Sequence, residues 1–136
     1  MIKPKTTVLL VDDNDMMRAL LRGILRSEHV EVIGETRDGV HAIEMAERLK
    51  PDVILLDIMM PAMDGLEALR EIHRQQPDTK VIMITGSPSA ENVQESIDNG
   101  ASAFIVKPFN AAKVLNTLER VLKPPVPEKP ETKTKD

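Results

Sequence analysis

Five short apolar runs, each followed by a segment with helical periodicity, constrain this chain more than any other feature of its sequence. Each run is four residues long and rich in β-branched side chains, which is typical of a β-strand. The runs are Val8–Val11, Val30–Ile33, Val53–Leu56, Val81–Ile84 and Ala103–Val106. Four of them are apolar throughout, as expected for strands that helices cover on both faces. The second carries Glu31 in its middle, so we place it at an edge of the sheet.

Apolar residues recur at helical spacing in the segments between and after these runs. The expected helices cover Met16–Leu25, Val40–Leu49, Leu66–Ile72, about Ser89–Asp98 and Ala111–Leu122. Asp64 and Asn110 stand where N-caps of the third and the fifth helix are expected, and Ser87 where one is expected for the fourth. The fourth helix has few apolar residues, so we predict that it is the least anchored and the most able to move.

This alternation predicts an α/β domain with a doubly wound, five-stranded parallel sheet and right-handed crossovers. We expect the flavodoxin-like strand order 2-1-3-4-5, with helices on both faces and a switch point between strands one and three. The predicted domain spans residues 1–122. Residues 123–136 contain four prolines and a single large apolar residue, Val126, which favours a disordered tail or the stump of a linker.

Composition excludes several classes of function. The 136 residues carry a net charge of −4 and two aromatic side chains, Phe104 and Phe109, which argues against direct binding to nucleic acid. The chain has no cysteine, which excludes disulfides, thiolate metal sites and a cysteine nucleophile. No apolar run approaches the ~20 residues that span a bilayer, and no secretory signal is visible. We therefore expect a cytoplasmic protein without membrane insertion.

Polar residues of chemical interest stand at the ends of four predicted strands. They are Asp12 and Asp13 after the first strand, Asp57 after the third, Thr85 at the end of the fourth and Lys107 after the fifth. The carboxyl ends of parallel strands share one edge of the sheet, and ligands bind in the crevice there. We therefore expect these five side chains to lie close together.

The three carboxylates among them indicate a cation site. Strands one and three are neighbours in the expected order, so Asp12, Asp13 and Asp57 would repel one another without a cation or shifted pKa values. An acidic site made of oxygen ligands favours Mg²⁺, which is held by one or two carboxylates together with phosphate and water. The long side chain of Lys107 can approach from two strands away and contact a phosphoryl oxygen.

This pattern resembles the receiver domain of two-component response regulators, over residues 6–122. The resemblance rests on Asp12-Asp13, Leu55-Leu56-Asp57-Ile58-Met59-Met60-Pro61, Met63-Asp64-Gly65, Thr85-Gly86 and Lys107-Pro108-Phe109. It implies that Asp57 accepts a phosphoryl group from a sensor histidine kinase or a phosphotransfer protein. The face of helix 4, strand 5 and helix 5 would then bind a downstream protein target, which the sequence does not identify. The sequence is similar to the receivers of chemotaxis regulators and of transcriptional regulators alike, so the resemblance does not decide the subfamily.

The resemblance also implies roles for single residues. Asp13, Asp57 and the backbone carbonyl of Met59 would hold Mg²⁺, and Asp12 would do so through water. Thr85 would turn toward the new phosphoryl group, and Lys107 would form a salt bridge with it.

Two further expectations follow from the same resemblance. Phe104 would swing inward behind the threonine hydroxyl, and the Lys107–Pro108 bond would be cis. The domain would catalyse only its own phosphorylation and dephosphorylation, and it would not act as an enzyme on another substrate.

Two alternatives belong to other classes. A Mg²⁺-dependent aspartyl phosphohydrolase, as in the haloacid-dehalogenase superfamily, needs a second aspartate two residues after the nucleophile, where this chain has Met59. A constitutive receiver-like interaction module would never be phosphorylated, but such modules usually lose part of the acidic set. His29, His41 and His73 lack metal-ligand spacing, and we interpret them as surface residues.

Overall fold

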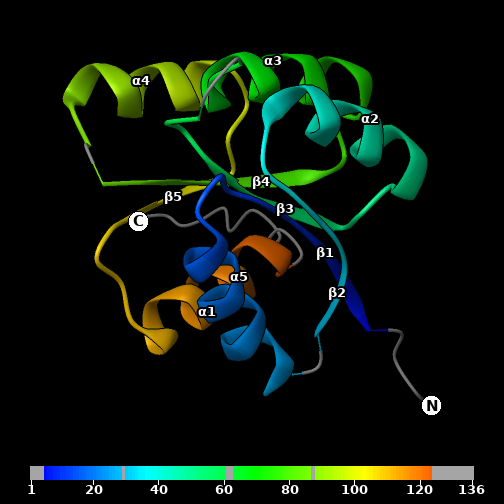
Figure 1. Ribbon diagram of the computed structural model, residues 1–136. Coiled ribbons are helices and arrows are strands. Elements are labelled where there is room, and N and C mark those ends of the chain that lie inside the picture. Colours follow the sequence, from blue (N-terminus) through cyan, green and yellow to red (C-terminus); the bar gives the residue numbers. More distant parts are fainter. Residues whose placement is uncertain (1–4, 29, 61–62, 87, 124–136) are drawn as a thin grey trace, which may run out of the picture.

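The computed structural model describes residues 5–28, 30–60, 63–86 and 88–123. Strands and helices alternate along this part of the chain (Figure 1). The strands are β1 (Thr6–Val11), β2 (Val30–Thr36), β3 (Val53–Asp57), β4 (Lys80–Thr85) and β5 (Ala103–Val106). The helices are α1 (Asp15–Arg26), α2 (Gly39–Leu49), α3 (Gly65–Gln75), α4 (Ala90–Asp98) and α5 (Ala111–Leu122).

The five strands form one parallel sheet in the order β2-β1-β3-β4-β5. Helices α1 and α5 cover one face, and α2, α3 and α4 cover the other (Figure 1). The predicted fold class and strand order are therefore confirmed. β2 lies at an edge, as Glu31 indicated, and Glu31 is exposed.

Each face of the sheet has its own hydrophobic core, because successive strand side chains point to opposite faces. Leu9 and Leu56 belong to the cluster beneath α2 and α3, whereas Leu10 and Leu55 belong to the cluster beneath α1 and α5. β3 is buried along its whole length. The central strands are thus fixed on both sides, and their carboxyl ends present polar side chains from a rigid base.

Side-chain N-caps begin all five described helices. The capping oxygens belong to Asn14, Asp38, Asp64, Ser89 and Asn110, and each accepts a backbone N–H three residues on. The predictions for Asp64 and Asn110 are confirmed. The prediction of Ser87 as the cap of α4 was wrong, since a cap must directly precede the first helical residue and that position belongs to Ser89. Ser87 itself lies outside the described residues.

Several apolar residues at helical spacing are exposed. Met16 is 82% exposed on α1, and Ile97 is 58% exposed on α4. On α4 it is Ser96 that is buried, and its hydroxyl donates to the backbone carbonyl of Asn92. Helix α4 therefore has even fewer apolar contacts than its sequence indicated.

The three histidines differ in their surroundings. His41 is exposed, as predicted, and its Nδ1 lies 2.9 Å from Oδ2 of Asp38. His73 is half-buried and so less exposed than predicted, because Gly100 packs directly on its ring. A Cβ at Gly100, where φ is +103°, would stand 2.5 Å from the imidazole. His29 lies outside the described residues.

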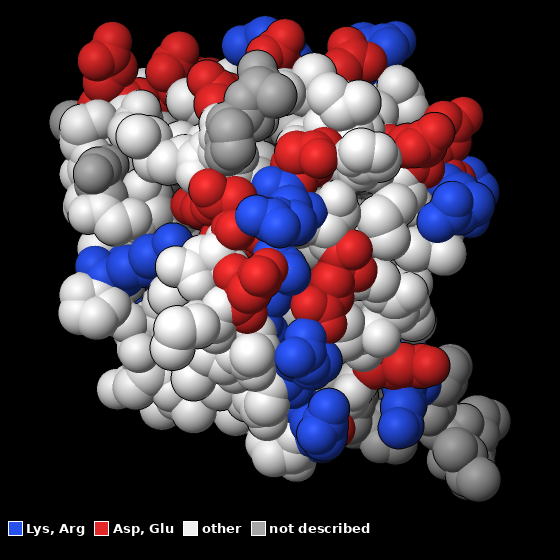
Figure 2. Space-filling view, viewed as in Figure 1, with Lys and Arg blue, Asp and Glu red and all other residues white. Residues whose placement is uncertain are grey.

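Charges are mixed on the face seen in Figure 2, where Lys and Arg side chains are interspersed with Asp and Glu side chains. Among the described residues, no helix has the length and the apolar composition needed to cross a membrane.

Candidate functional site

The register of the sheet brings the predicted site residues to one edge. Val11 pairs with Leu56, so Asp12 follows β1 beside Asp57 at the end of β3. Thr85 pairs with Val106 at the ends of β4 and β5, so Lys107 begins the loop after that pair. The sheet thus delivers all of these residues to its carboxyl edge, as predicted.

The three carboxylates form a compact cluster. Asp12, Asp13 and Asp57 each offer an oxygen atom, and these oxygens lie within 4.8 Å of one another. Asp12 and Asp57 are buried, while Asp13 is half-buried and therefore partly exposed to solvent. Such spacing suits shared coordination of one cation, because each ligand is an oxygen that carries negative charge.

One oxygen of Asp12 has no hydrogen-bond partner. Its Oδ1 accepts the backbone N–H of Asn14 at 2.8 Å, but its buried Oδ2 accepts no hydrogen bond. The ammonium group of Lys107 approaches this oxygen, with Nζ 3.6 Å from Oδ2. A buried carboxylate oxygen without a donor is costly, and a bound cation or its water would satisfy it. The residues present therefore fit the predicted Mg²⁺ site.

The pKa of Asp57 is higher than that of an ordinary aspartate. Burial raises its pKa to about 6, and the negative charge of Asp12 adds to this effect. Lys107 and the backbone N–H of Met59 act in the opposite direction, the latter 3.4 Å from Oδ1. A raised pKa lets Asp57 keep a proton to higher pH, which reduces the repulsion within the cluster when no cation is bound.

Lys107 reaches the cluster from the far side of β4. Its Nζ lies 3.8 Å from Oδ1 of Asp57. Its backbone N–H donates to the carbonyl of Thr85 at 2.7 Å, which fixes the start of the loop. The peptide bond between Lys107 and Pro108 is cis, as the resemblance implied. One ammonium group therefore faces two carboxylates from different strands.

The residues predicted to act in switching, Thr85 and Phe104, lie on the neighbouring strands β4 and β5. Thr85 is fully buried at the end of β4. Phe104 is half-buried on β5 and packs against the core beneath α2 and α3. The side chain of Met59, 61% exposed, points away from the core. Their roles in phosphorylation and switching stay predictions.

Gly65 supports the site in a way that the sequence pattern did not explain. A Cβ at this residue would stand 2.2 Å from the backbone carbonyl oxygen of Asp57. Its N–H donates to the carbonyl of Ile58 at 2.7 Å. The first turn of α3 therefore packs directly on the backbone that carries Asp57. The glycine after the cap Asp64 was the available signal, but only the tertiary structure shows what it contacts.

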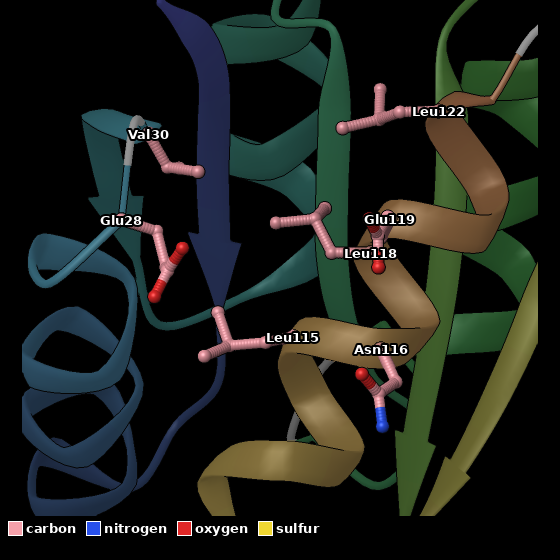
Figure 3. A pocket seen from close by; sticks show the side chains of 7 residues that line it. All are labelled: Glu28, Val30, Leu115, Asn116, Leu118, Glu119 and Leu122. Carbon is pink, nitrogen blue, oxygen red and sulfur yellow. The ribbon is translucent and has the colours of Figure 1, made fainter.

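A separate hollow lies on the face of the sheet that α1 and α5 cover, between the end of α1, the start of β2 and α5 (Figure 3). It has a volume of about 430 Å³. Its lining residues are Glu28, Val30, Leu115, Asn116, Leu118, Glu119 and Leu122. None of the predicted site residues lines it, so it plays no part in the chemistry of the carboxylate cluster.

Comparisons with known proteins agree with this geometry. A family model described as response regulator receiver domain matches residues 8–119. Chemotaxis protein CheY of Listeria monocytogenes is 42% identical over 116 residues, which are 85% of this chain and 98% of that protein. The transcriptional regulatory protein LiaR of Bacillus subtilis is 38% identical over 85% of this chain and 56% of its own length.

A solved structure is also similar. It is the crystal structure of the CheX-CheY-BeF3-Mg²⁺ complex from Borrelia burgdorferi. The similar chain has a TM-score of 0.84 and 34% identity, over 87% of this chain and 90% of that one.

Proposed function

Since this chain belongs to the response regulator receiver domain family, we propose that Asp57 accepts a phosphoryl group and thereby controls the binding of a downstream protein. The donor is a sensor histidine kinase or a phosphotransfer protein. The observation that carries the proposal is the placement of Asp57, which is buried beside Asp12 and Asp13 and faces the ammonium group of Lys107.

The chemistry is nucleophilic catalysis by a carboxylate. An oxygen of Asp57 attacks the phosphorus atom, a new O–P bond forms, and the P–N bond of the donor phosphohistidine breaks. The attacking carboxylate must be ionised, which its pKa of about 6 allows at neutral pH. Lys107 approaches from the β5 side of Asp57 and stabilises the charge on the phosphoryl oxygens. Asp13, Asp57 and the backbone carbonyl of Met59 would hold Mg²⁺, with Asp12 contacting it through water, and the ion would neutralise further negative charge.

Phosphorylation changes the charge and the contacts at the end of β3. The acyl phosphate carries about one more negative charge than the carboxylate that it replaces. Thr85 and Lys107 are the hydroxyl and the cation that new phosphoryl oxygens would engage. Both belong to strand ends on the side of α4, the weakly anchored helix, so the new contacts shift the population of the α4–β5–α5 face.

That face has the properties of a protein-binding surface. Ile97 on α4 and Val106 on β5 are exposed apolar residues. Two hollows, of about 220 and 560 Å³, share Phe104 in their lining. Inward movement of Phe104 would therefore change the shape of both. In the Borrelia complex the receiver is joined by a second protein, CheX, which supports a protein target here as well.

This chain is proposed to catalyse only its own phosphorylation and dephosphorylation, in the cytoplasm. The phosphohydrolase alternative lacks support, because the exposed thioether of Met59 cannot act as an acid or base. The constitutive interaction module is disfavoured because all three acidic residues are present and clustered.

The deciding experiment is intact-mass measurement after incubation with acetyl phosphate and Mg²⁺. We expect one added phosphoryl group in the wild type, and none in Asp57→Asn or without Mg²⁺. Beryllofluoride with Mg²⁺, followed by NMR, tests a short-lived adduct in the same series. If the mass does not change and beryllofluoride does not alter the NMR spectrum, the constitutive interaction module would be the better description. Turnover of a phosphomonoester would instead revive the phosphohydrolase.

A further inference from the structure

A half-buried arginine on α1 contacts the loop that carries the first two acidic residues. The side chain of Arg18 is 14% exposed. Its Nη1 donates to the backbone carbonyl of Asp12 at 2.6 Å, and its Nη2 donates to Asp15. Its Nε donates to Oε1 of Glu35 on β2 at 3.2 Å. One side chain thus joins β2, the first turn of α1 and the residue that follows β1.

The carbonyl of Asp12 and the N–H of Asp13 belong to the same planar peptide unit. A hydrogen bond to that carbonyl therefore fixes the plane from which the side chain of Asp13 extends. The N–H of Asp12 is held as well, by the carbonyl of Thr36 at 3.1 Å. If the carbonyl were released, the peptide plane could rotate and carry the Asp13 carboxylate out of the cluster.

We propose that Arg18 is a positioning residue for the cation site, which it supports by clamping the peptide between Asp12 and Asp13. A charged donor makes this hydrogen bond stronger than one between neutral groups. The planar guanidinium reaches its three acceptors from three different nitrogens in a fixed geometry, whereas the three donors of a lysine share one nitrogen. This inference rests on the proposed Mg²⁺ site, because a positioning role has meaning only if the site binds the ion.

The chain supplies a matched control. Arg22 lies one turn further along α1 and binds the other oxygen, Oε2, of the same Glu35. The side-chain hydrogen bond to the Asp12 carbonyl comes from Arg18, whereas the guanidinium of Arg22 donates to Glu35. Loss of Arg22 therefore weakens the pairing of α1 with β2 and leaves the clamp in place, whereas loss of Arg18 removes the clamp and one of the two contacts to Glu35.

The test is Mg²⁺ titration of metal-free wild type, Arg18→Ala, Arg18→Lys and Arg22→Ala by isothermal titration calorimetry. We expect the Kd to rise about 10-fold or more in Arg18→Ala, the range found for groups that orient metal ligands. Arg18→Lys should fall between this variant and the wild type. Arg22→Ala should stay within about twofold of the wild type, in line with a contact outside the site.

A second readout needs neither metal nor phosphoryl transfer. The N–H of Asn14 is protected by Oδ1 of Asp12, so its hydrogen exchange should accelerate in Arg18→Ala and not in Arg22→Ala. Equal Kd values for Arg18→Ala and the wild type would overturn the inference, as would an equal loss in Arg22→Ala. If the wild type itself binds no Mg²⁺, the proposed function fails first and the clamp fails with it.

Discussion

The Nζ of Lys107 lies 3.8 Å from Oδ1 of Asp57, although β4 separates β3, which ends at Asp57, from β5, which Lys107 directly follows. The long aliphatic stem of the lysine spans the width of one strand, and the ammonium group also approaches Oδ2 of Asp12. The contact therefore joins both halves of the carboxyl edge and balances part of its negative charge.

Replacement of Asp57 by Asn should stabilise the metal-free protein at neutral pH. The pKa of Asp57 rises from an ordinary 3.8 to about 6 on folding, so the folded state binds more protons between these values. Stability therefore falls as pH rises through this window, and the loss persists above it. At pH 7 we expect Asp57→Asn to gain about 1–2 kcal/mol, less than the full shift implies because solvent reaches the site.

Urea unfolding of both proteins without Mg²⁺, from pH 3.5 to 7.5, measures this difference. It should shrink as pH falls from 6 toward 3.8 and be smallest at pH 3.5, where the carboxyl is mostly protonated in both states. Asp78→Asn, on an exposed turn, is the control and should show no such dependence. A difference that stays constant with pH would show that ionisation of Asp57 is not its cause.

Mg²⁺ should stabilise the wild type and lose this effect in Asp13→Asn. An ion that binds only the folded state at 100 times its Kd adds about 2.7 kcal/mol to the free energy of unfolding. Thermal unfolding with increasing Mg²⁺, and again after a chelator is added, measures it. Glu28→Gln, which alters the separate hollow of Figure 3, should respond like the wild type. Equal stabilisation of Asp13→Asn would place the ion elsewhere.

Removal of the Lys107 charge should raise the pKa of Asp57 above about 6, since the ammonium group acts to lower it. Carboxyl ¹³C NMR titration of Lys107→Ala tests this directly, and Lys113→Ala on the exposed start of α5 is the control. Mg²⁺ affinity should not fall in Lys107→Ala, because no competing cation remains beside Asp12. An unchanged or lowered pKa would mean that the 3.8 Å contact does not persist in solution.

Gly65→Ala should damage both stability and the site. The new Cβ would stand 2.2 Å from the backbone oxygen of Asp57, so α3 or the end of β3 must move. We expect a loss of about 1–3 kcal/mol, typical of overpacking, together with weaker Mg²⁺ binding. Gly23→Ala is the matched control, because nothing lies within 4 Å of its added Cβ inside α1. That variant should gain about 0.5–1 kcal/mol from helix propensity.

Chemical unfolding and Mg²⁺ calorimetry on both glycine variants decide the matter. Gly65→Ala with unaltered stability and affinity would contradict the close packing of α3 on the Asp57 backbone.

Thr85→Ala should separate phosphoryl acceptance from switching. The nucleophile and the acidic cluster are intact in this variant, so the mass adduct with acetyl phosphate should still form. Beryllofluoride with Mg²⁺ should shift the amide NMR signals of α4, β5 and α5 in the wild type, and shift them much less in Thr85→Ala. Equal shifts in both proteins would remove the threonine hydroxyl from the switching mechanism.

The sequence by itself determined the strands, the helices, the order of the sheet and the edge at which Asp12, Asp13, Asp57, Thr85 and Lys107 meet. It could do so because hydrophobic periodicity and capping are local, and because parallel strands with helical crossovers have few allowed arrangements. Residues that directly follow strands are placed by that topology alone. This is why the acidic cluster could be expected before any contact was known.

Tertiary structure decided what depends on packing between distant segments. The α1 periodicity could not show that Met16 is exposed, and an isolated histidine could not show that His73 lies under Gly100. The pKa of Asp57 depends on how deeply its carboxyl is buried and on charges from two other strand ends. The clamp of Arg18 on the Asp12 carbonyl depends on an angle between α1 and β1. Such contacts depend on how side chains from distant segments pack together, and the periodicity of the sequence does not report on that packing.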